Sequence, residues 1–292
     1  MTKQTKPKSD EEIKKFLSEK VKSSGLSLEN DVSRFLKQNY IVKREVPFYD
    51  KDEQKGRTFD VLARKFFPNE SDFDKGERHS VAQYNLIIEC KNLPGHVWVF
   101  DYDELETFTI PEHSSINKGK KPDPVYNVIP YDPIPDIPFV SGYSEYWFDE
   151  KKSNKKDTNL FSAIMSTTKA SNHMKNSLDK LFDEYPKFHP AKQAFILHFA
   201  FFQPVIVFTG KIFISKFHEG KTEFFRTKFV QMNVGYESKE YHITSGNIHI
   251  VEYEYLEEYI KMVDKHYRQK ENKMIKNKKI FLECLNMTGF NF

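Results

Sequence analysis

The first hundred residues change from helical to extended hydrophobic patterns. In residues 10–21 and 27–39 the apolar side chains recur at helical spacing, and Ser27 is the expected N-cap of the second helix. The segments that follow are rich in β-branched and aromatic residues, and turn-forming residues separate them. Four strands are therefore predicted after the two helices, at residues 39–49, 57–66, 84–91 and 96–101.

The middle of the chain is marked by proline. Residues 111–138 hold seven of the fourteen prolines, which predicts an irregular insertion without a regular helix, spanning about residues 103–156. We expect 111–138 to lack regular secondary structure. We also expect it to pack on the rest of the protein through Tyr126, Ile129 and Tyr131, because a solvated linker is poorer in such side chains.

The second half returns to regular patterns. Residues 159–185 have an apolar helical face, and the strongly apolar run 194–214 predicts a buried helix end that breaks at Pro204. Polar residues and a glycine interrupt this run, so we do not expect it to cross a membrane. Four further strands are predicted at residues 205–208, 212–217, 224–234 and 248–255. A closing helix is predicted at residues 255–279.

These elements predict an α/β protein with a polar N-terminal segment, 1–24, and a single domain, 25–292. The net charge of +3 and the pI of 8.5 are compatible with a nucleic-acid partner without requiring one. Cys90 and Cys284 are the only cysteines, which excludes a disulfide framework and a four-cysteine zinc site and is typical of the reducing cytoplasm. A cytoplasmic location is therefore expected.

The strand at 84–91 ends with two charged residues. Side chains alternate along a strand, so Ile87, Glu89 and Lys91 share one face, and Cys90 points to the other as a core residue. Burying a charge is costly unless it is paired or binds a metal. The pattern therefore indicates either a salt bridge at the edge of a sheet or a functional site.

Two more carboxylates lie in unusual places. Asp60 is in the middle of an apolar strand, which both strand propensity and burial disfavour. Glu29 lies in the first turn of the second helix and borders its apolar face. Structural explanations exist for both, because Asp60 can accept hydrogen bonds from a loop and Glu29 can complement the helix dipole.

Taken together, these residues form an ordered pattern: a helix with Glu29, a strand, a strand with Asp60, and a strand that ends in Glu89-x-Lys91. The pattern resembles the PD-(D/E)xK nuclease superfamily, and the stretches GLSLEND, RTFD and LIIECKN look most like its archaeal Holliday-junction-resolvase and Mrr-type branches. The resemblance covers residues 25–92. Phe59 stands where the superfamily often has proline, and the 28 residues between Asp60 and Glu89 make a longer hairpin than usual.

The resemblance implies a restriction-endonuclease-like core, with a central mixed β-sheet flanked by helices, and metal-dependent hydrolysis of phosphodiester bonds. Asp60, Glu89 and the Cys90 backbone carbonyl would hold Mg²⁺ or Mn²⁺, which take oxygen ligands. Lys91 would orient the attacking water or stabilise the charged phosphorus centre. Glu29 would hold a second metal ion or a water bound to the first.

The expected substrate is DNA, with RNA as an alternative. A protein that binds nucleic acid without cutting it, and that keeps the nuclease fold, is a rival of a different class. A homodimer is a further expectation, and no membrane partner is expected. Candidate phosphate contacts are the lysines at positions 65, 118, 120, 121, 151–156, 169 and 265–279.

Overall fold

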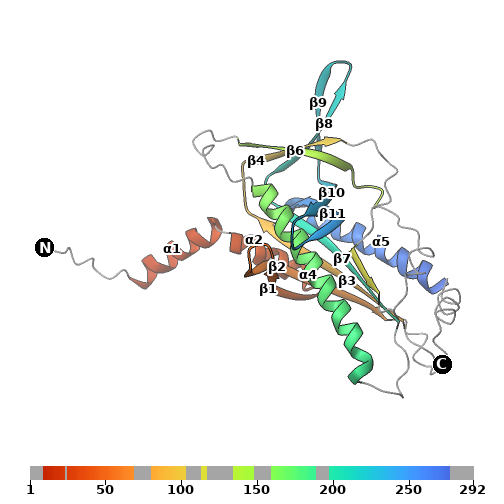
Figure 1. Ribbon diagram of the computed structural model, residues 1–292. Helices are drawn as coiled ribbons and strands as arrows, with labels where there is room; N and C mark the ends of the chain where they lie inside the picture. Colours follow the sequence, from red (N-terminus) through yellow and green to blue (C-terminus); the bar gives the residue numbers. More distant parts are fainter. Residues whose placement is uncertain are drawn as a thin grey trace.

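A single mixed β-sheet dominates the described part of the chain, and helices pack against it (Figure 1). The computed structural model describes residues 9–23, 25–68, 80–102, 113–116, 134–147, 159–188 and 197–276. The helices are α1 (Asp10–Ser23), α2 (Gly25–Leu36), α4 (Asn159–Phe188), α5 (Leu256–Lys276) and the short 3-10 helix η3 (Tyr253–Tyr255).

Eleven strands make up the sheet. Their bounds are β1 (Ile41–Asp50), β2 (Lys55–Pro68), β3 (Ser80–Lys91), β4 (His96–Tyr102), β5 (His113–Ile116), β6 (Phe139–Trp147), β7 (Leu197–Phe208), β8 (Lys211–His218), β9 (Lys221–Thr227), β10 (Phe229–Glu237) and β11 (His242–Glu252). The order across the sheet is β1-β2-β3-β7-β11-β10-β6-β4-β8-β9, and β5 pairs with β7 beside this path. The structure thus confirms an α/β protein with a large mixed sheet.

Three parallel strands form the centre of the sheet. Strand β3 pairs with β7 through Lys91 and Phe208, and β7 pairs with β11 through Phe208 and Glu252, so all three strands end at one edge. Antiparallel β2 and β1 continue the sheet on the β3 side. Ligands of open α/β sheets commonly bind outside the carboxyl ends of the strands, so this edge is the first place to look for a site.

The chain leaves this edge by two short turns. One turn connects β3 to β4 and the other connects β7 to β8, and β4 and β8 then pair with each other in parallel. In Figure 1, β4 and β6 are drawn above β10 and β11, and the β8–β9 hairpin projects at the top. Trp98 of β4 stacks on Phe208 of β7, with ring centroids 3.6 Å apart. This contact joins β4 to the central parallel strands.

Each face of the central strands has its own core. Helices α2 and α5 cover one face, where Leu86, Ile88 and Cys90 of β3 are buried. Helix α4 covers the other face, where Ile87 packs with Leu62 and Ala170. A third cluster fills the space between β4, β8, β10, β11 and the first turns of α4. The alternation of β3 residues between two cores confirms the predicted strand phase.

The predicted elements of the first hundred residues are present in the predicted order, but the start of α2 differs. The helix begins at Gly25, so Ser27 lies inside its first turn and is not the N-cap. Helix α1 ends at Ser23 and α2 begins at Gly25, earlier than the capping pattern indicated. The helix still buries Leu28, Val32 and Leu36 on its predicted apolar face.

The helix end expected before Pro204 is wrong, because residues 197–208 form one continuous strand. Pro204 is tolerated in β7 because it lies where one edge of β7 changes its partner strand from β5 to β11. Residues up to Phe202 pair with β5, and residues from Val205 pair with β11. The Gln203 side chain donates to the Pro204 carbonyl at 3.0 Å and to the Asn247 carbonyl at 2.9 Å. These two backbone carbonyls, at the point where the partner strand changes, thus have hydrogen-bond donors.

The proline-rich insertion contributes two strands to the sheet. Strand β5 pairs with the first half of β7, so the expectation that 111–138 lacks regular structure is wrong for residues 113–116. Strand β6 pairs with β4 and β10. At the end of the segment Ile134 and Ile137 are buried, whereas Tyr126, Ile129 and Tyr131, the residues expected to pack, lie outside the described residues.

Two hairpins differ in detail from the predicted pattern. The single strand predicted at 224–234 is divided between β9 and β10, with the break at Lys228. Residues 69–79, between β2 and β3, lie outside the described residues, but the two strands pair antiparallel despite the unusually long spacing. Among the described helices, none combines the length and apolarity that crossing a bilayer requires.

Candidate active site

The candidate site lies at the carboxyl end of β3. Val61 of β2 pairs with Ile88, which places Asp60 opposite Glu89 at the next position. There the Cys90 amide donates to Asp60 Oδ2 at 2.6 Å. The Asp60 side chain thus extends the hydrogen bonding between β2 and β3 beyond their backbone ladder. Asp60 and Glu89, which lie 29 positions apart in the chain, are thereby neighbours.

A local twist explains how Asp60 fits into an apolar strand. Val61 packs in the core beneath α2 and α5, whereas Phe59 packs in the core beneath α4. Residues two positions apart share a face in a regular strand, so β2 rotates at Asp60. The neighbouring strand is distorted at the same level, where Glu45 has a φ of 48°. The carboxylate therefore lies at an irregular point of the sheet and not in the middle of a regular ladder.

Glu89 is buried and only half satisfied. Lys91 Nζ donates to Glu89 Oε1 at 2.9 Å, as expected for two charged side chains on one strand face. Within the described residues, no hydrogen-bond partner reaches Glu89 Oε2, although this oxygen is buried. A buried, unpartnered carboxylate oxygen is costly in a folded protein. A salt bridge with Lys91 alone therefore does not account for Glu89.

Glu29 approaches the same place from α2. Arg44 Nη2 of β1 lies 3.5 Å from Glu29 Oε2, and the same guanidinium donates to the Asn30 side chain. The pKa of Glu29 is raised, first by burial and next by the negative charge of Asp60. The structure thus brings Glu29, Asp60, Glu89 and Lys91 into one electrostatic group.

Arg44 is the site residue that the sequence did not reveal. Its charge opposes the rise in the pKa of Asp60, and it holds Glu29 by the ion pair. Arg44 pairs in register with Val61, one position from Asp60. An arginine in a strand is ordinary in a sequence, and only the pairing register of β1 with β2 marks it as part of the site.

The site carries more negative charge than its cations balance. The pKa of Asp60 is raised to about 6, mainly by burial and then by the charge of Glu89, while the Cys90 amide, Lys91 and Arg44 act in the opposite direction. Burial raises the pKa of the Cys90 thiol well above its usual value. Cys90 therefore serves as a core residue, as expected, and its thiol is a poor nucleophile.

The donor set fits a hard divalent cation. Asp60 and Glu89 offer carboxylate oxygens, one of them without a partner, and a cation would offset the repulsion that raises the pKa of Asp60. In an extended strand the amide and carbonyl of one residue face the same neighbour, so the Cys90 carbonyl faces Asp60 with its amide. No cluster of three or more His, Cys, Asp or Glu side chains in a metal-holding arrangement occurs in the described ranges.

The predicted phosphate contacts have mixed outcomes. Lys169 is wrong as a surface cation, because it is buried between the Tyr236 and Tyr241 rings and pairs with Asp50 at 3.1 Å. Lys65 pairs with Asp264 of α5 at 2.5 Å. The lysines at 118, 120, 121, 151–156 and 277–279 lie outside the described residues.

The resemblance to PD-(D/E)xK nucleases therefore rests on four residues of this chain and on the way its strands place them. Their arrangement is compatible with the expected roles and is also compatible with a binding protein that has no activity. Compared with known proteins, the chain matches no family model, no curated protein and no solved structure.

Proposed function

We propose that the protein is a metal-dependent nuclease that hydrolyses phosphodiester bonds in DNA. The observation that carries the proposal is the buried Glu89 Oε2, which has no partner among the described residues and lies beside Asp60, a carboxyl with a pKa of about 6. A site that concentrates negative charge in this way is costly for the fold, and the cost is understandable if a cation is bound during function.

Each residue has a defined part in the proposal. Asp60, Glu89 and the Cys90 carbonyl would hold Mg²⁺ or Mn²⁺, and the ion, when bound, polarises the phosphate and lowers the pKa of water. Glu29 would provide a further acceptor for water at the site. Arg44 positions Glu29, since its guanidinium bonds both Glu29 and Asn30.

Lys91 would supply a positive charge to the reacting phosphate from its place beside Glu89. Its ammonium is held by Glu89 Oε1 on the same strand face, which limits the positions that it can reach. A preorganised cation of this kind can orient the attacking water and stabilise the charge that develops on the phosphate oxygens. The Glu89 carboxylate thus has two functions, one toward the metal and one toward Lys91.

The decisive experiment compares cleavage by the wild type and single variants on duplex and branched DNA, with Mg²⁺, Mn²⁺ or EDTA. We expect Lys91→Ala to cut about 10²–10³-fold more slowly, the usual cost of one aimed charge at a transition state. Glu89→Gln is expected to be at least as severe, because it removes a metal ligand. Lys261→Ala is the matched control, because Lys261 is an exposed lysine on α5 whose only ion pair in the described residues is with Glu257.

The non-catalytic rival has one observation in its favour. Lys91 and Arg44 already neutralise Glu89 and Glu29 without a metal, as structural ion pairs do. A protein that binds DNA in EDTA and in Mg²⁺ alike, and that cuts in neither, would support this rival. Preferential cleavage of RNA over duplex DNA in a competition assay would instead change the substrate and keep the chemistry. Cleavage by Lys91→Ala at the wild-type rate would move the active site elsewhere.

A further inference from the structure

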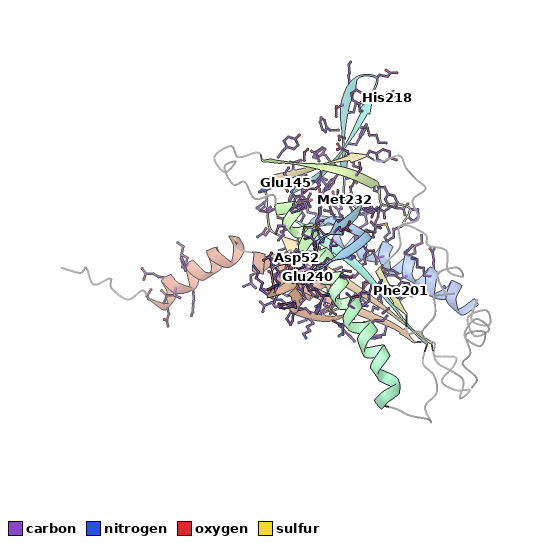
Figure 2. The ribbon with its side chains drawn as sticks, viewed as in Figure 1. Asp52, Glu145, Phe201, His218, Met232 and Glu240 are labelled. Carbon is purple, nitrogen blue, oxygen red and sulfur yellow. The ribbon has the colours of Figure 1, made fainter. Side chains whose placement is uncertain are left out.

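The β8–β9 hairpin presents three aromatic rings to solvent, and two of them are the most exposed. Phe217 is 78 % exposed and Phe224 is 59 % exposed. Figure 2 labels His218 at the outer end of this hairpin, away from the rest of the molecule. Exposed phenylalanines close together on a projecting element are unusual for a purely structural hairpin and indicate a binding surface.

The pairing register separates the hairpin into two different faces. Cross-strand partners share a face, so Phe217 lies with Thr222, and the neighbouring pair, Ser215 and Phe224, lies on the same side. The opposite face carries Lys216 and its neighbour Phe225. We call the face that carries Phe217 and Phe224 the aromatic face.

The face opposite the aromatic face is held to the protein. Lys216 Nζ lies 3.7 Å from the centroid of the Tyr102 ring and 5.9 Å from that of Phe225. The contact with Tyr102 connects the hairpin to β4, whereas the contact with Phe225 lies within the hairpin. Phe225 on this opposite face is 46 % exposed, less than Phe217 and Phe224, so the aromatic face is the more open of the two. Lys221, near the turn, pairs with His218 and is an exposed cation on the opposite face.

The root of the hairpin is joined to the candidate active site. The Thr209 amide donates to the Lys91 carbonyl at 3.1 Å, and β8 begins two residues later. Buried Glu252 fixes the next residues, because it accepts from the Ile212 amide at 2.5 Å and from Arg226 Nη2 at 2.5 Å. These hydrogen bonds therefore connect the candidate site rigidly to the hairpin that carries the aromatic face.

The separation of the two places is suited to a polymer. Six strand residues separate Lys211 from Phe217, which corresponds to roughly 20 Å, or on the order of six base steps of duplex DNA. A small ligand cannot contact both the candidate site and the aromatic face. A nucleic acid can, and its phosphates can meet Lys221, the exposed cation at the turn end of the hairpin.

We propose that Phe217 and Phe224 stack on unpaired bases, so that the substrate is DNA with a single-stranded segment joined to a duplex, such as a flap or a branch. Bases within a duplex are covered by their neighbours, whereas splayed bases stack readily on aromatic side chains. The proposal rests on the proposed function, because it takes nucleic acid to be the ligand of the candidate site.

The test measures binding in EDTA, so that no cleavage is needed. Two fluorescently labelled DNAs of equal duplex length are compared by anisotropy, one blunt and one with a single-stranded flap. We expect Phe217→Ala/Phe224→Ala to bind the flap DNA on the order of tenfold more weakly, with the affinity for blunt duplex changed less than twofold. Phe217→Trp/Phe224→Trp should restore flap binding, and Thr222→Ala, on the same face, is the matched control.

Several results would overturn the inference. Equal loss on both DNAs would indicate general damage or duplex contact, and an unchanged affinity would remove the rings from recognition. Sedimentation that shows a dimer lost in the alanine variant would make a second copy of this chain the occupant. Flap-selective loss in a protein that never cuts would sustain this inference while the proposed catalytic function fails, so the two failures are separable.

Discussion

At the scale of single residues, Asp60 links the candidate site to the stability of the fold. Its pKa is about 6 in the folded protein, against an ordinary value of 3.8. The folded state therefore binds more protons than the unfolded state between about pH 4 and pH 6, and stability falls as pH rises through this window. Ionised Asp60 therefore makes the folded state less stable at neutral pH than it is with Asp60 protonated.

The first prediction is that Asp60→Asn stabilises the protein at pH 8. The amide is uncharged, so the variant avoids the repulsion by Glu89, and we expect a gain of roughly 1–3 kcal/mol in the free energy of unfolding. The gain should disappear near pH 4, where Asp60 is protonated in the wild type. Chemical denaturation at the two pH values measures both.

The comparison variant for this experiment, Asp52→Asn, should change the free energy of unfolding in the opposite direction. Hydrogen bonds from Lys169, Ser238 and Tyr236 lower the pKa of Asp52 to about 2, so its charge favours the folded state. Asp52→Asn should therefore destabilise the protein above about pH 4. If Asp60→Asn also destabilises at pH 8, the negative charge of Asp60 has a structural partner that we have not recognised.

The second prediction concerns the pH dependence of cleavage. Asp60 must lose its proton to serve as a metal ligand, and its pKa of about 6 places this step close to neutrality. At a fixed subsaturating concentration of Mg²⁺, we expect the rate to rise as pH increases through about 6. Higher Mg²⁺ should move the midpoint to lower pH, because metal and proton compete for the carboxylate. A rate independent of pH between 5 and 8 would contradict this role.

The sequence alone could locate part of this site. Strand phase places Glu89 and Lys91 on one face, and an aspartate in an apolar strand signals Asp60 as exceptional. Arg44 could not be found in this way, because its relevance depends on the register between β1 and β2. Lys169 was misjudged because a lysine in a helix is usually exposed, and its aspartate partners lie more than 100 positions away.

At the scale of elements, the turn from β7 to β8 depends on a glycine. A side chain on Gly210 would collide with the His96 carbonyl oxygen and with the ring of Phe208. The carbonyl belongs to the backbone at the start of β4 and cannot move aside without shifting that strand. The turn also holds Thr209, whose amide bonds the Lys91 carbonyl. Close packing at Gly210 thus supports the geometry of the candidate site.

The third prediction is that Gly210→Ala destabilises the protein by roughly 1–3 kcal/mol, the usual cost of overpacking. We also expect slower cleavage, because the turn that supports Lys91 must shift. Thermal unfolding and the cleavage assay measure the two effects. Gly56→Ala is the matched control, because a methyl group there would have no atom within 4 Å and the backbone needs no positive φ. Equal stability of the two variants would show that the turn tolerates a side chain.

Elements were predictable from the sequence where the local pattern sufficed. The early helices and strands have clear periods, and their order was correct. The apolar run before Pro204 was ambiguous, because a buried helix and a buried strand both consist of continuous apolar residues. The proline argued for a break, and only the change of partner from β5 to β11 explains why the strand continues. Strand β5 was missed because its partner β7 lies more than 80 positions later.

At the scale of the whole molecule, the candidate site joins segments from distant parts of the chain. Helix α2, β1, β2 and β3 supply its side chains, while β7 and β11 hold the same sheet edge. The carboxylates accumulate there only when the fold is complete, because Asp60 and Glu89 approach each other through the β2–β3 register. A metal ion that binds this edge will therefore bind the folded chain in preference to the unfolded chain.

The last prediction follows from this linkage. A ligand that binds only the folded state stabilises it by mass action, by about 2.7 kcal/mol at a concentration one hundred times its Kd. We expect Mn²⁺ or Mg²⁺ to raise the Tm of the wild type without any DNA, and EDTA to reverse the rise. Glu89→Gln should lose the effect, because it removes the ligand with the unpartnered oxygen. Glu53→Gln, which changes an exposed carboxylate in the β1–β2 turn, should retain it. An equal rise in Tm for Glu89→Gln and the wild type would place the metal elsewhere on the protein, and the case for Asp60 and Glu89 as metal ligands would end there.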